Sequence, residues 1–524
     1  MLQPRALGVC LTLSIAGSAL AGIATNQTSP NVIILTIDTL RADHLGSYGY
    51  EAASTPHLDK LAAEGLRFTQ ATTPFPRTTP ALASLFTGLL PQNHGSREIG
   101  EPIRAGKLMA ECLRAWGYAT VAVSANKAAG TRANLHRGFD RFAGARELKD
   151  LTAARVTGAA LALAREVPSA KPLFLWVHYL DPHFPYRPPQ SFQPQPSAPA
   201  CRELMSRFDR KELLKGDVYG DRDGISNAAH EDCIRLYDAE ISYTDREVSR
   251  LLEGLRAAGR LDKAIVVLTS DHGENLGEER LFYEHGPNVH DASVVVPLIA
   301  VGPGFRRGVD DGVIRLEDLM PTLFALLEIP APSDAPMDGM DLSVRFRPTR
   351  GQVGEADPIA YVESGSSFHP TYSHVVVSGQ AGHRSCVHGE RFSLCSEPGE
   401  KPQLYDRSSD PGFEVDVSAA HPGPLQVLSA ARLQWPAEEA RQRAVRTRDF
   451  KLVEYPRLEG GYRRTLFDLR SRSNDPKDVS ADYPDVATRL GLVLERWTAT
   501  IPSKAPVARL ESDLELLRSL GYVE

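Results

Sequence analysis

The sequence predicts an α/β protein built around a largely parallel central sheet, followed by a smaller C-terminal α+β domain. Before Pro330, short runs of Val, Ile and Leu alternate with stretches of helical periodicity. Uninterrupted apolar runs are typical of strands buried on both faces, as in parallel sheets. Asp38 and Asp271 each follow the end of such a run, where parallel sheets place their ligand sites.

The expected strands are the apolar runs of strand length, namely Val32–Ile37, Ala119–Val123, Leu173–Val177, Ile265–Leu268 and Leu298–Val301. The expected helices are the stretches between them with helical patterns, namely His57–Glu64, Leu108–Trp116, Ile234–Ala257 and Leu316–Leu327. This alternation predicts helices that cover both faces of one sheet.

The pattern of the sequence changes after a segment near Pro330–Asp341 that is rich in Pro, Asp and Gly. Short strands and turns follow it, and Leu404-Tyr405-Asp406 is repeated as Leu466-Phe467-Asp468, each shortly before an Asp-Pro pair. We interpret the repeat as a duplicated element. The predicted units are a catalytic domain at 30–345, with a Pro-rich and then charged insertion at 187–232, and an α+β subdomain at 346–524.

The N-terminus has the features of a secretory signal peptide. Arg5 precedes the apolar run Ala6–Leu20, and Ala19-Leu20-Ala21 supplies the small residues of a cleavage site. We therefore expect residues 1–21 to be removed from a periplasmic or secreted protein. The run is short for a membrane span and no later segment looks transmembrane, so no stable membrane span is expected.

Charge and cysteine content narrow the class further. The net charge is −7, with acids and bases mixed along the chain, so a nucleic acid is not expected as a partner. Export permits disulfides, and the expected pairs are Cys201–Cys233 around the insertion and Cys386–Cys395 across a turn. Cys112 lies in an apolar stretch and is expected to be a buried free thiol. The sequence leaves the oligomeric state open.

Thr78 lies in the most informative segment. Arg77-Thr78-Thr79-Pro80-Ala81-Leu82 follows a Pro-rich turn and leads into an apolar stretch that ends at Phe86. The pattern predicts a loop that delivers a hydroxyl to a helix N-terminus, where backbone N–H groups and the helix dipole favour an anion. Thr78 is thus a candidate nucleophile or metal ligand. The alternative is a purely structural role as the N-cap of the helix.

Asp38, Asp271 and His272 are candidate ligands of one divalent cation, with the Thr78 hydroxyl as a further ligand. A cation would lower the pKa of a bound hydroxyl and screen the repulsion between an anionic ester and its nucleophile. Oxygen ligands with one His leave calcium, magnesium, manganese and zinc open. An Asp after a strand is often only a turn residue, so the prediction depends on the combination.

With these residues the chain resembles the sulfatase branch of the alkaline phosphatase superfamily. The matching segments are 31–46, 55–59, 84–95, 181–186, 237–240, 270–274, 466–468 and 517–522, which span nearly the whole chain after the signal peptide. The resemblance implies the α/β sandwich of that superfamily. It also implies a metal-dependent hydrolase whose substrate is an anionic ester, either a small molecule or a glycan.

The chain departs from the sulfatase pattern at the nucleophile. Such sulfatases have a Cys/Ser-x-Pro-x-Arg motif whose first residue is oxidised to formylglycine, whereas this chain has Thr78, Pro80 and Leu82 there. Arg77 is the nearest cation to the missing Arg, and Thr39 stands where many sulfatases have another metal-binding Asp. Thr-x-Pro before Thr-Gly is similar to the nucleophile segment of nucleotide pyrophosphatase/phosphodiesterases, and phosphoethanolamine transferases of the superfamily also use a Thr.

The resemblance to those relatives implies attack by Thr78 on a phosphate mono- or diester. His183 and His285 match positions around the bound anion, where one would contact the ester and the other protonate the leaving group. Asp181 with both histidines holding a second metal is an alternative. Asn126 and Lys127 are candidate substrate contacts. The competing functions are hydrolysis of a sulfuric ester without formylglycine, and non-catalytic binding of a glycan or anion.

Overall fold

The structure is a computed structural model. It describes residues 29–148, 150–195, 197–209, 226–278, 282–347, 357–365, 376–379, 385–388, 392–396, 401–406, 409, 415–426, 429, 441–456, 462–470 and 477–501. The predicted signal peptide at 1–21 and the closing segment at 517–522 lie outside the described residues. Within the described part, no helix is both long enough and apolar enough to cross a membrane.

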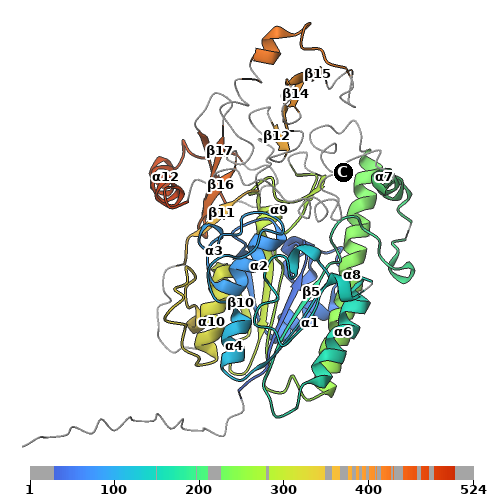
Figure 1. Cartoon of the computed structure of the whole chain (residues 1–524), viewed down its shortest axis with the longest axis vertical. Helices are drawn as coiled ribbons and strands as arrows, with labels where there is room; N and C mark the ends of the chain where they lie inside the picture. The colour runs from blue at the N-terminus through green and yellow to red at the C-terminus, as the bar shows by residue number, and fades with distance from the viewer. Residues whose placement is uncertain are drawn as a thin grey trace, which may run out of the picture.

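A mostly parallel sheet forms the centre of the molecule (Figure 1). Its strands are β1 (Val32–Ile37), β2 (Leu66–Thr72), β3 (Ala119–Ser124), β4 (Arg141–Ala143), β5 (Leu173–Tyr179), β6 (Ile265–Thr269), β9 (Val295–Val301) and β10 (Gly308–Arg315). They lie in the order β10-β2-β9-β6-β1-β5-β3-β4. β9 runs antiparallel to both of its neighbours and the other adjacent pairs are parallel, so the predicted sheet is confirmed.

The central strands alternate their side chains between two cores. Ile33 and Leu35 of β1 belong to one core, and Val32 and Ile34 belong to the other. The first core packs on α1 (Pro56–Glu64), α6 (Ala153–Glu166) and α8 (Asn227–Ala257), and the second on α2 (Thr78–Thr87), α4 (Met109–Ala115) and α10 (Leu319–Leu326). A strand with apolar residues on both faces needs a helical layer on each side, which explains why its sequence is uniformly apolar.

The remaining elements of the larger part are short or lie at its rim. They are α3 (Pro91–His94), α5 (Ala145–Leu148), α7 (Pro199–Asp209), α9 (Asp291–Val294), β7 (Asn275–Leu276) and β8 (Phe282–Glu284), with 3-10 turns at Ala42–His44, Gly46–Tyr48, Lys127–Ala129, Gln190–Phe192, Leu316–Asp318 and Ser343–Arg345. The insertion predicted at 187–232 thus contains α7, and its last residues already belong to α8, whose N-cap is Ser226. A disulfide between Cys201 and Cys233 joins the two helices, as predicted.

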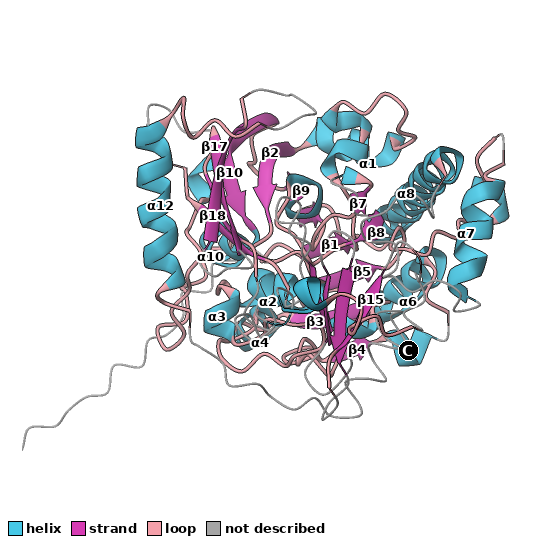
Figure 2. Ribbon diagram, turned by 90° about the horizontal axis from the view of Figure 1, so that it is seen from above, coloured by secondary structure: helices cyan, strands magenta, loops and turns pink. Residues whose placement is uncertain are grey.

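The C-terminal part contains two antiparallel sheets. One consists of β11 (Ala360–Glu363), β16 (Arg443–Arg446), β17 (Phe450–Pro456) and β18 (Tyr462–Asp468), and the other of β12 (Val376–Gly379), β13 (Ser385–His388), β14 (Phe392–Ser396) and β15 (Gln403–Asp406). α12 (Pro484–Thr498) packs on the first sheet through Leu490 and Leu494. Figure 1 shows this part above the carboxyl ends of the central strands, and Figure 2 shows α12 and α7 on opposite sides of the molecule.

The predicted repeat is visible in matching hydrogen bonds. The Leu404 N–H donates to Asp416 and Ser418 at 3.1 and 3.0 Å, and its carbonyl accepts from Val417. The equivalent leucine, Leu466, makes the same three bonds to Asp478, Ser480 and Val479. Both leucines lie in the last strand of their sheet. The same strand-and-turn element therefore occurs twice.

The other cysteines agree with the sequence where they are described. Cys112 is a buried free thiol, and burial raises its pKa to about 11. Cys395 is disulfide-bonded, and Cys386 lies opposite it in the β13–β14 ladder.

Candidate active site and metal centre

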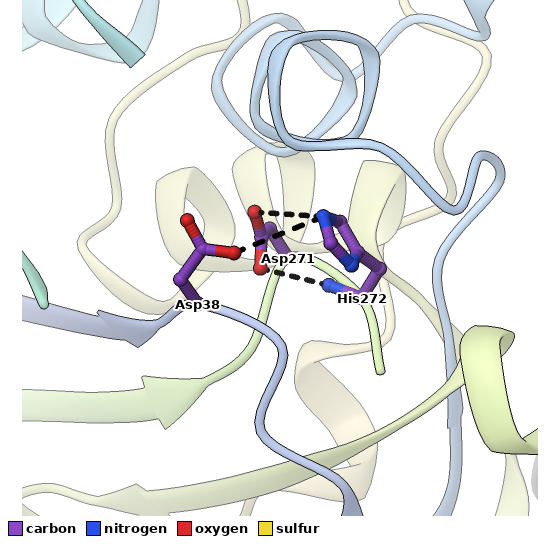
Figure 3. Close-up of side chains that lie close together, drawn as sticks. All are labelled: Asp38, Asp271 and His272. Atoms are coloured by element: carbon purple, nitrogen blue, oxygen red, sulfur yellow. Dashed lines mark hydrogen bonds and ion pairs between the residues drawn. The ribbon is translucent and has the colours of Figure 1, made fainter. Parts of the chain in front are cut away.

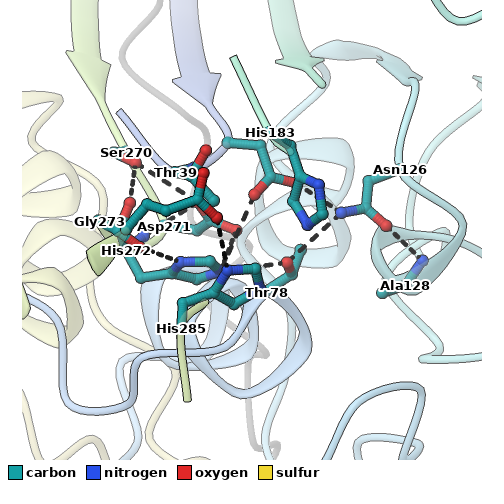
Figure 4. Close-up of polar contacts among 12 residues, drawn as sticks. Thr39, Thr78, Asn126, Ala128, His183, Ser270, Asp271, His272, Gly273 and His285 are labelled. Carbon is teal, nitrogen blue, oxygen red and sulfur yellow. Dashed lines mark hydrogen bonds and ion pairs between the residues drawn. The ribbon is translucent and has the colours of Figure 1, made fainter. Parts of the chain in front are cut away.

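Polar side chains from separate segments meet at the carboxyl edge of the sheet (Figure 4). Asp38 follows β1, Asn126 follows β3, and Asp271 and His272 follow β6. These strands and β5 are adjacent and parallel, so their carboxyl ends lie side by side. α2 brings Thr78 to the same place as its first residue.

Asp38, Asp271 and His272 form a compact cluster (Figure 3). His272 Nε2 lies 3.4 Å from Asp271 Oδ2 and 3.9 Å from Asp38 Oδ1. All three side chains are 0% exposed. The ligand atoms of the three residues all lie within 4.8 Å of one another. Two buried carboxylates this close repel each other, so a positive charge between them would stabilise the arrangement.

The two carboxylate oxygens of Asp38 differ in their hydrogen bonding. Its Oδ2 accepts a hydrogen bond of 2.5 Å from Asn126 Nδ2 and lies 3.3 Å from His178 Nε2. Its Oδ1 is buried and has no hydrogen-bond partner among the described residues. Burial raises the pKa of Asp38, but the bond with His178 and the charges of His183 and His272 outweigh it, and the net pKa is below the ordinary value.

Asp271 is divided in the same way. Its Oδ1 accepts from the backbone N–H groups of His272 at 2.9 Å and Thr39 at 3.3 Å. Its Oδ2 is buried and has no hydrogen-bond partner in the part of the chain that the structure describes. Burial and the negative charge of Asp38 raise the pKa of Asp271. A bound cation would reverse this, because it favours the ionised carboxylate.

His272 presents a lone pair to the same point. Its Nδ1 lies 2.9 Å from the carbonyl oxygen of Gly273. A carbonyl can only accept, so Nδ1 carries a proton, and in the neutral tautomer that a metal ion requires, Nε2 is the acceptor. The cluster therefore offers Asp38 Oδ1, Asp271 Oδ2 and His272 Nε2, which fits one divalent cation and contains three of the four predicted ligands.

Thr78 lies next to these ligand atoms. Its Oγ1 is 3.3 Å from His272 Nε2 and 3.4 Å from Asn126 Nδ2. Thr78 is 3% exposed and opens α2, where the unpaired backbone N–H groups and the helix dipole attract negative charge. The N-cap of α2 is Arg77 and not Thr78, so the Thr78 hydroxyl is not used for capping.

Two further histidines border the cluster. The His285 ring stacks on His272 with 4.3 Å between centroids, and the His183 ring meets His285 edge-on at 5.0 Å. His285 Nδ1 lies 3.2 Å from Glu274 Oε1, and Tyr186 donates to the other oxygen of Glu274 at 2.6 Å. The carboxylate of Glu274 thus accepts a hydrogen bond from Nδ1–H of His285 and fixes the orientation of this ring.

Other predicted residues lie outside this cluster. Lys127 is exposed, whereas its neighbour Asn126 is buried against Asp38. Asp181 accepts a hydrogen bond of 2.7 Å from Ala153 N–H at the start of α6. In the described residues, the one group of acidic and imidazole ligands close enough to hold a metal is Asp38, Asp271 and His272. One oxygen of Asp181 is thereby bonded at the start of α6, and the second-metal role considered for this residue stays a prediction.

Sequence reasoning missed His178 and the role of Glu274. His178 is at the end of β5, in register with Thr36 of β1, and its Nδ1 lies 2.8 Å from Thr36 Oγ1. The expected strand ended at Val177, one residue too early to include it. A single His in a wholly buried strand beside β1 was the available signal, because such a polar group needs a partner.

Comparison with known proteins identifies the family. The sulfatase family model matches residues 30–329, which is more than half of the chain. The chain therefore belongs to the sulfatase family and is a sulfatase-like ester hydrolase. Enzymes of this family use a divalent metal ion, in agreement with the ligand cluster.

Similar proteins include both sulfatases and a phosphonate hydrolase. The chain is 24% identical over 454 residues to an arylsulfatase of Clostridium perfringens, covering 73% of this chain and 89% of that protein. It is 26% identical over 478 residues to human arylsulfatase A, covering 79% and 89%. The fold is similar to that of BT4656, solved with its substrate D-glucosamine-2-N,6-O-disulfate (TM-score 0.63, 17% identity, 91% of this chain and 99% of that chain). It is also similar to phosphonate monoester hydrolase from Silicibacter pomeroyi (TM-score 0.59, 19% identity, 90% and 96%).

Proposed function

We propose that this chain is a metal-dependent hydrolase of phosphate mono- or diesters and that Thr78 is its nucleophile. The observation that carries the proposal is the place of Thr78 Oγ1, 3.3 Å from His272 Nε2 and beside the unpaired carboxylate oxygens. A hydroxyl at this point, at a helix N-terminus, faces both the metal ligands and an anion-binding end of α2.

A divalent cation held by Asp38, Asp271 and His272 would lower the pKa of the neighbouring hydroxyl and screen the charge of the ester. The Thr78 hydroxyl loses its proton to solvent, and Oγ1 attacks phosphorus and forms a P–O bond as the bond to the leaving oxygen breaks. His183 or His285 donates a proton to that oxygen. A water molecule then hydrolyses the phosphothreonine and restores the free hydroxyl.

The charge of the site favours an ester with a single negative charge. The described contacts of Asp38, Asp271 and Thr78 are with Asn126, Ser270, backbone N–H groups and histidines, and they include no Lys or Arg. Leu82, at the position of the family's Arg, is 0% exposed and belongs to the core under α2. One cation and two carboxylates nearly cancel, so a diester monoanion is easier to accommodate than a monoester dianion.

Hydrolysis of a sulfuric ester is the second candidate, because the curated relatives include arylsulfatases. A sulfate monoester also carries one negative charge, so the charge of the site does not separate it from a diester. Thr78 weighs against it, since a Thr is not converted into formylglycine. Pure binding of a glycan or anion is the third candidate, and the complete metal-ligand set weighs against it.

A panel of 4-nitrophenyl esters tests the proposal. We expect bis(4-nitrophenyl) phosphate to be hydrolysed faster than 4-nitrophenyl phosphate and 4-nitrophenyl sulfate. Thr78→Ala should lose more than about 1000-fold in kcat, and Thr78→Ser should retain part of the activity. Thr87→Ala is the matched control, because Thr87 ends the same helix and donates to Ala83 O. Full diester turnover by Thr78→Ala, or faster sulfate than phosphate hydrolysis, would refute the proposal.

Export is part of the same proposal. The N-terminal sequence pattern supports a periplasmic or secreted location, and N-terminal sequencing of the native protein tests it. We expect the mature chain to begin near Gly22.

A further inference from the structure

We propose that Arg77 is a positioning residue that fixes Thr78 relative to His285, and that the C-terminal part of the chain supplies its clamp. The inference rests on the proposed function in one respect, because it takes Thr78 as the nucleophile. It adds a role for residues that touch neither the metal ligands nor the ester.

The Arg77 side chain is held by an ion pair with Glu98, and a second ion pair joins Glu98 to Arg441 in the C-terminal part of the chain. Arg77 Nη1 donates to Glu98 Oε2, and Arg441 Nη2 donates to Glu98 Oε1 at 2.7 Å. Arg441 also donates to the carbonyl of Ser364 at 2.8 Å. Arg77 and Arg441 are 8% and 5% exposed, so water weakens these pairs little.

The end of β11 and the two residues after it lie between two loops of the site. The Glu363 N–H donates to the carbonyl of Pro74 at 3.1 Å, in the loop that leads to Thr78. The Gly365 N–H donates to the carbonyl of Gly286 at 2.7 Å, in the loop that follows His285. Residues 363–365 therefore bond to both loops through the backbone.

Arg77 fills the space where these segments meet. A Cβ added at Gly286 or at Gly365 would overlap the Arg77 guanidinium. Gly286 has a φ of +101°, a conformation that favours Gly, whereas Gly365 is constrained by space alone. The guanidinium is thus packed between the residue next to His285 and the end of the segment 363–365.

These contacts give Arg77 control over the geometry of the reaction. Arg77 precedes Thr78 in the chain and packs against Gly286, the residue after His285. A displaced Arg77 side chain therefore changes the position of Thr78 relative to His285. A misplacement of about 1 Å between reacting groups costs about 100-fold in rate. The expected effect is on kcat, because Asp38, Asp271, His272 and Asn126 lie on other segments and stay in place.

Gly365→Ala and Arg77→Gln are the informative variants. Gly365→Ala displaces the guanidinium sterically and leaves every charge unchanged, and Arg77→Gln removes the charge. We expect each to lower kcat for bis(4-nitrophenyl) phosphate by about 10- to 100-fold, with KM and bound metal within about twofold of the wild type. Arg345→Gln is the control, because it breaks a comparable pair with Asp310 far from Thr78 in the chain and at the edge strand β10.

Hydrogen exchange gives a readout that does not need turnover. We expect the backbone amides of both segments, 74–82 and 284–290, to exchange faster in Arg77→Gln and in Gly365→Ala than in the wild type. In Arg345→Gln their exchange rates should be unchanged. Unchanged kcat in Arg77→Gln, or faster exchange in only one of the two segments, would overturn the inference. If the wild type hydrolyses no ester, the proposed function fails, and the exchange experiment alone still decides whether Arg77 couples the two loops.

Discussion

Replacement of Glu363 by Gln tests how strongly buried charges hold the C-terminal part against the site. Glu363 is 3% exposed and accepts hydrogen bonds from Arg97 at 2.7 and 2.9 Å and from Arg443 at 3.0 Å. Burial opposes its charge, but Arg97, Arg441 and Arg443 prevail and lower its pKa from 4.5 to about 2. Because the group is almost fully buried, this difference corresponds to about 3 kcal/mol of folding free energy.

The sign of the pH dependence follows from the lowered pKa. The folded state favours the carboxylate, so the stabilisation is fully present above about pH 5 and is lost as the pH falls toward 2. At pH 4 about 0.8 kcal/mol of it is already lost, since the unfolded chain binds a proton there and the folded chain does not. Gln cannot ionise, so the variant lacks both the stabilisation and its pH dependence.

Urea unfolding at pH 7 and pH 4, with a chelator present so that metal binding does not contribute, measures both effects. We expect the free energy of unfolding of Glu363→Gln to be about 3 kcal/mol below that of the wild type at pH 7. At pH 4 we expect this difference to be smaller by about 0.8 kcal/mol. Glu64→Gln is the control, because Glu64 forms an exposed pair with Lys60 at 4.0 Å and no other ion pair among the described residues. A difference below about 1 kcal/mol at pH 7, or one that does not change with pH, would refute this reasoning.

Two further predictions concern the metal centre. Asp271→Ala should remove stoichiometric metal and lower kcat/KM by more than about 1000-fold, several kcal/mol of transition-state stabilisation, and metal analysis with ester turnover checks this. Retention of both metal and activity would contradict the ligand assignment. His178→Ala should weaken metal affinity by about 10- to 100-fold, because it frees the oxygen of Asp38 that His178 orients, and activity should return at saturating metal. The exposed His57, replaced by Ala, is its control, and equal metal affinity in the two variants would exclude this role for His178.

Much of the fold could be predicted because its signals are local. A strand such as β1 is buried on both faces, so its apolar run alone marks it, and its boundaries coincide with the expected ones. β2 and β10 were missed because they carry polar residues, among them Arg67 and Asp310, on exposed or partly exposed positions. Their place in the sheet depends on pairing partners that are distant in sequence, which local periodicity does not encode.

The site was predictable where a residue type carries chemistry at the end of a strand. Asp38, Asp271 and His272 were predicted in this way and Thr78 by its place before a helix, and the structure brings the four side chains together. His178 was not predicted, because a His within a buried run has no local mark of function. Asn126 and Lys127 are neighbours in sequence, yet one is buried against Asp38 and the other exposed, and only the turn after β3 distinguishes them.

The departures from the sulfatase pattern have a common physical consequence. In the alignment that we propose, Leu82 takes the place of an Arg, so a fixed positive charge beside Thr78 is missing, and an apolar side chain lies in the core beneath α2. Arg77 does not replace that charge, because its guanidinium is paired with Glu98 and packed against Gly286 and Gly365. In the proposed reaction, stabilisation of the anion would therefore be left to the cation, the α2 N-terminus, Asn126 and the two histidines. A site with so little fixed positive charge would select against dianionic esters, and this connects the proposed loss of the Arg to the diester preference proposed for Thr78.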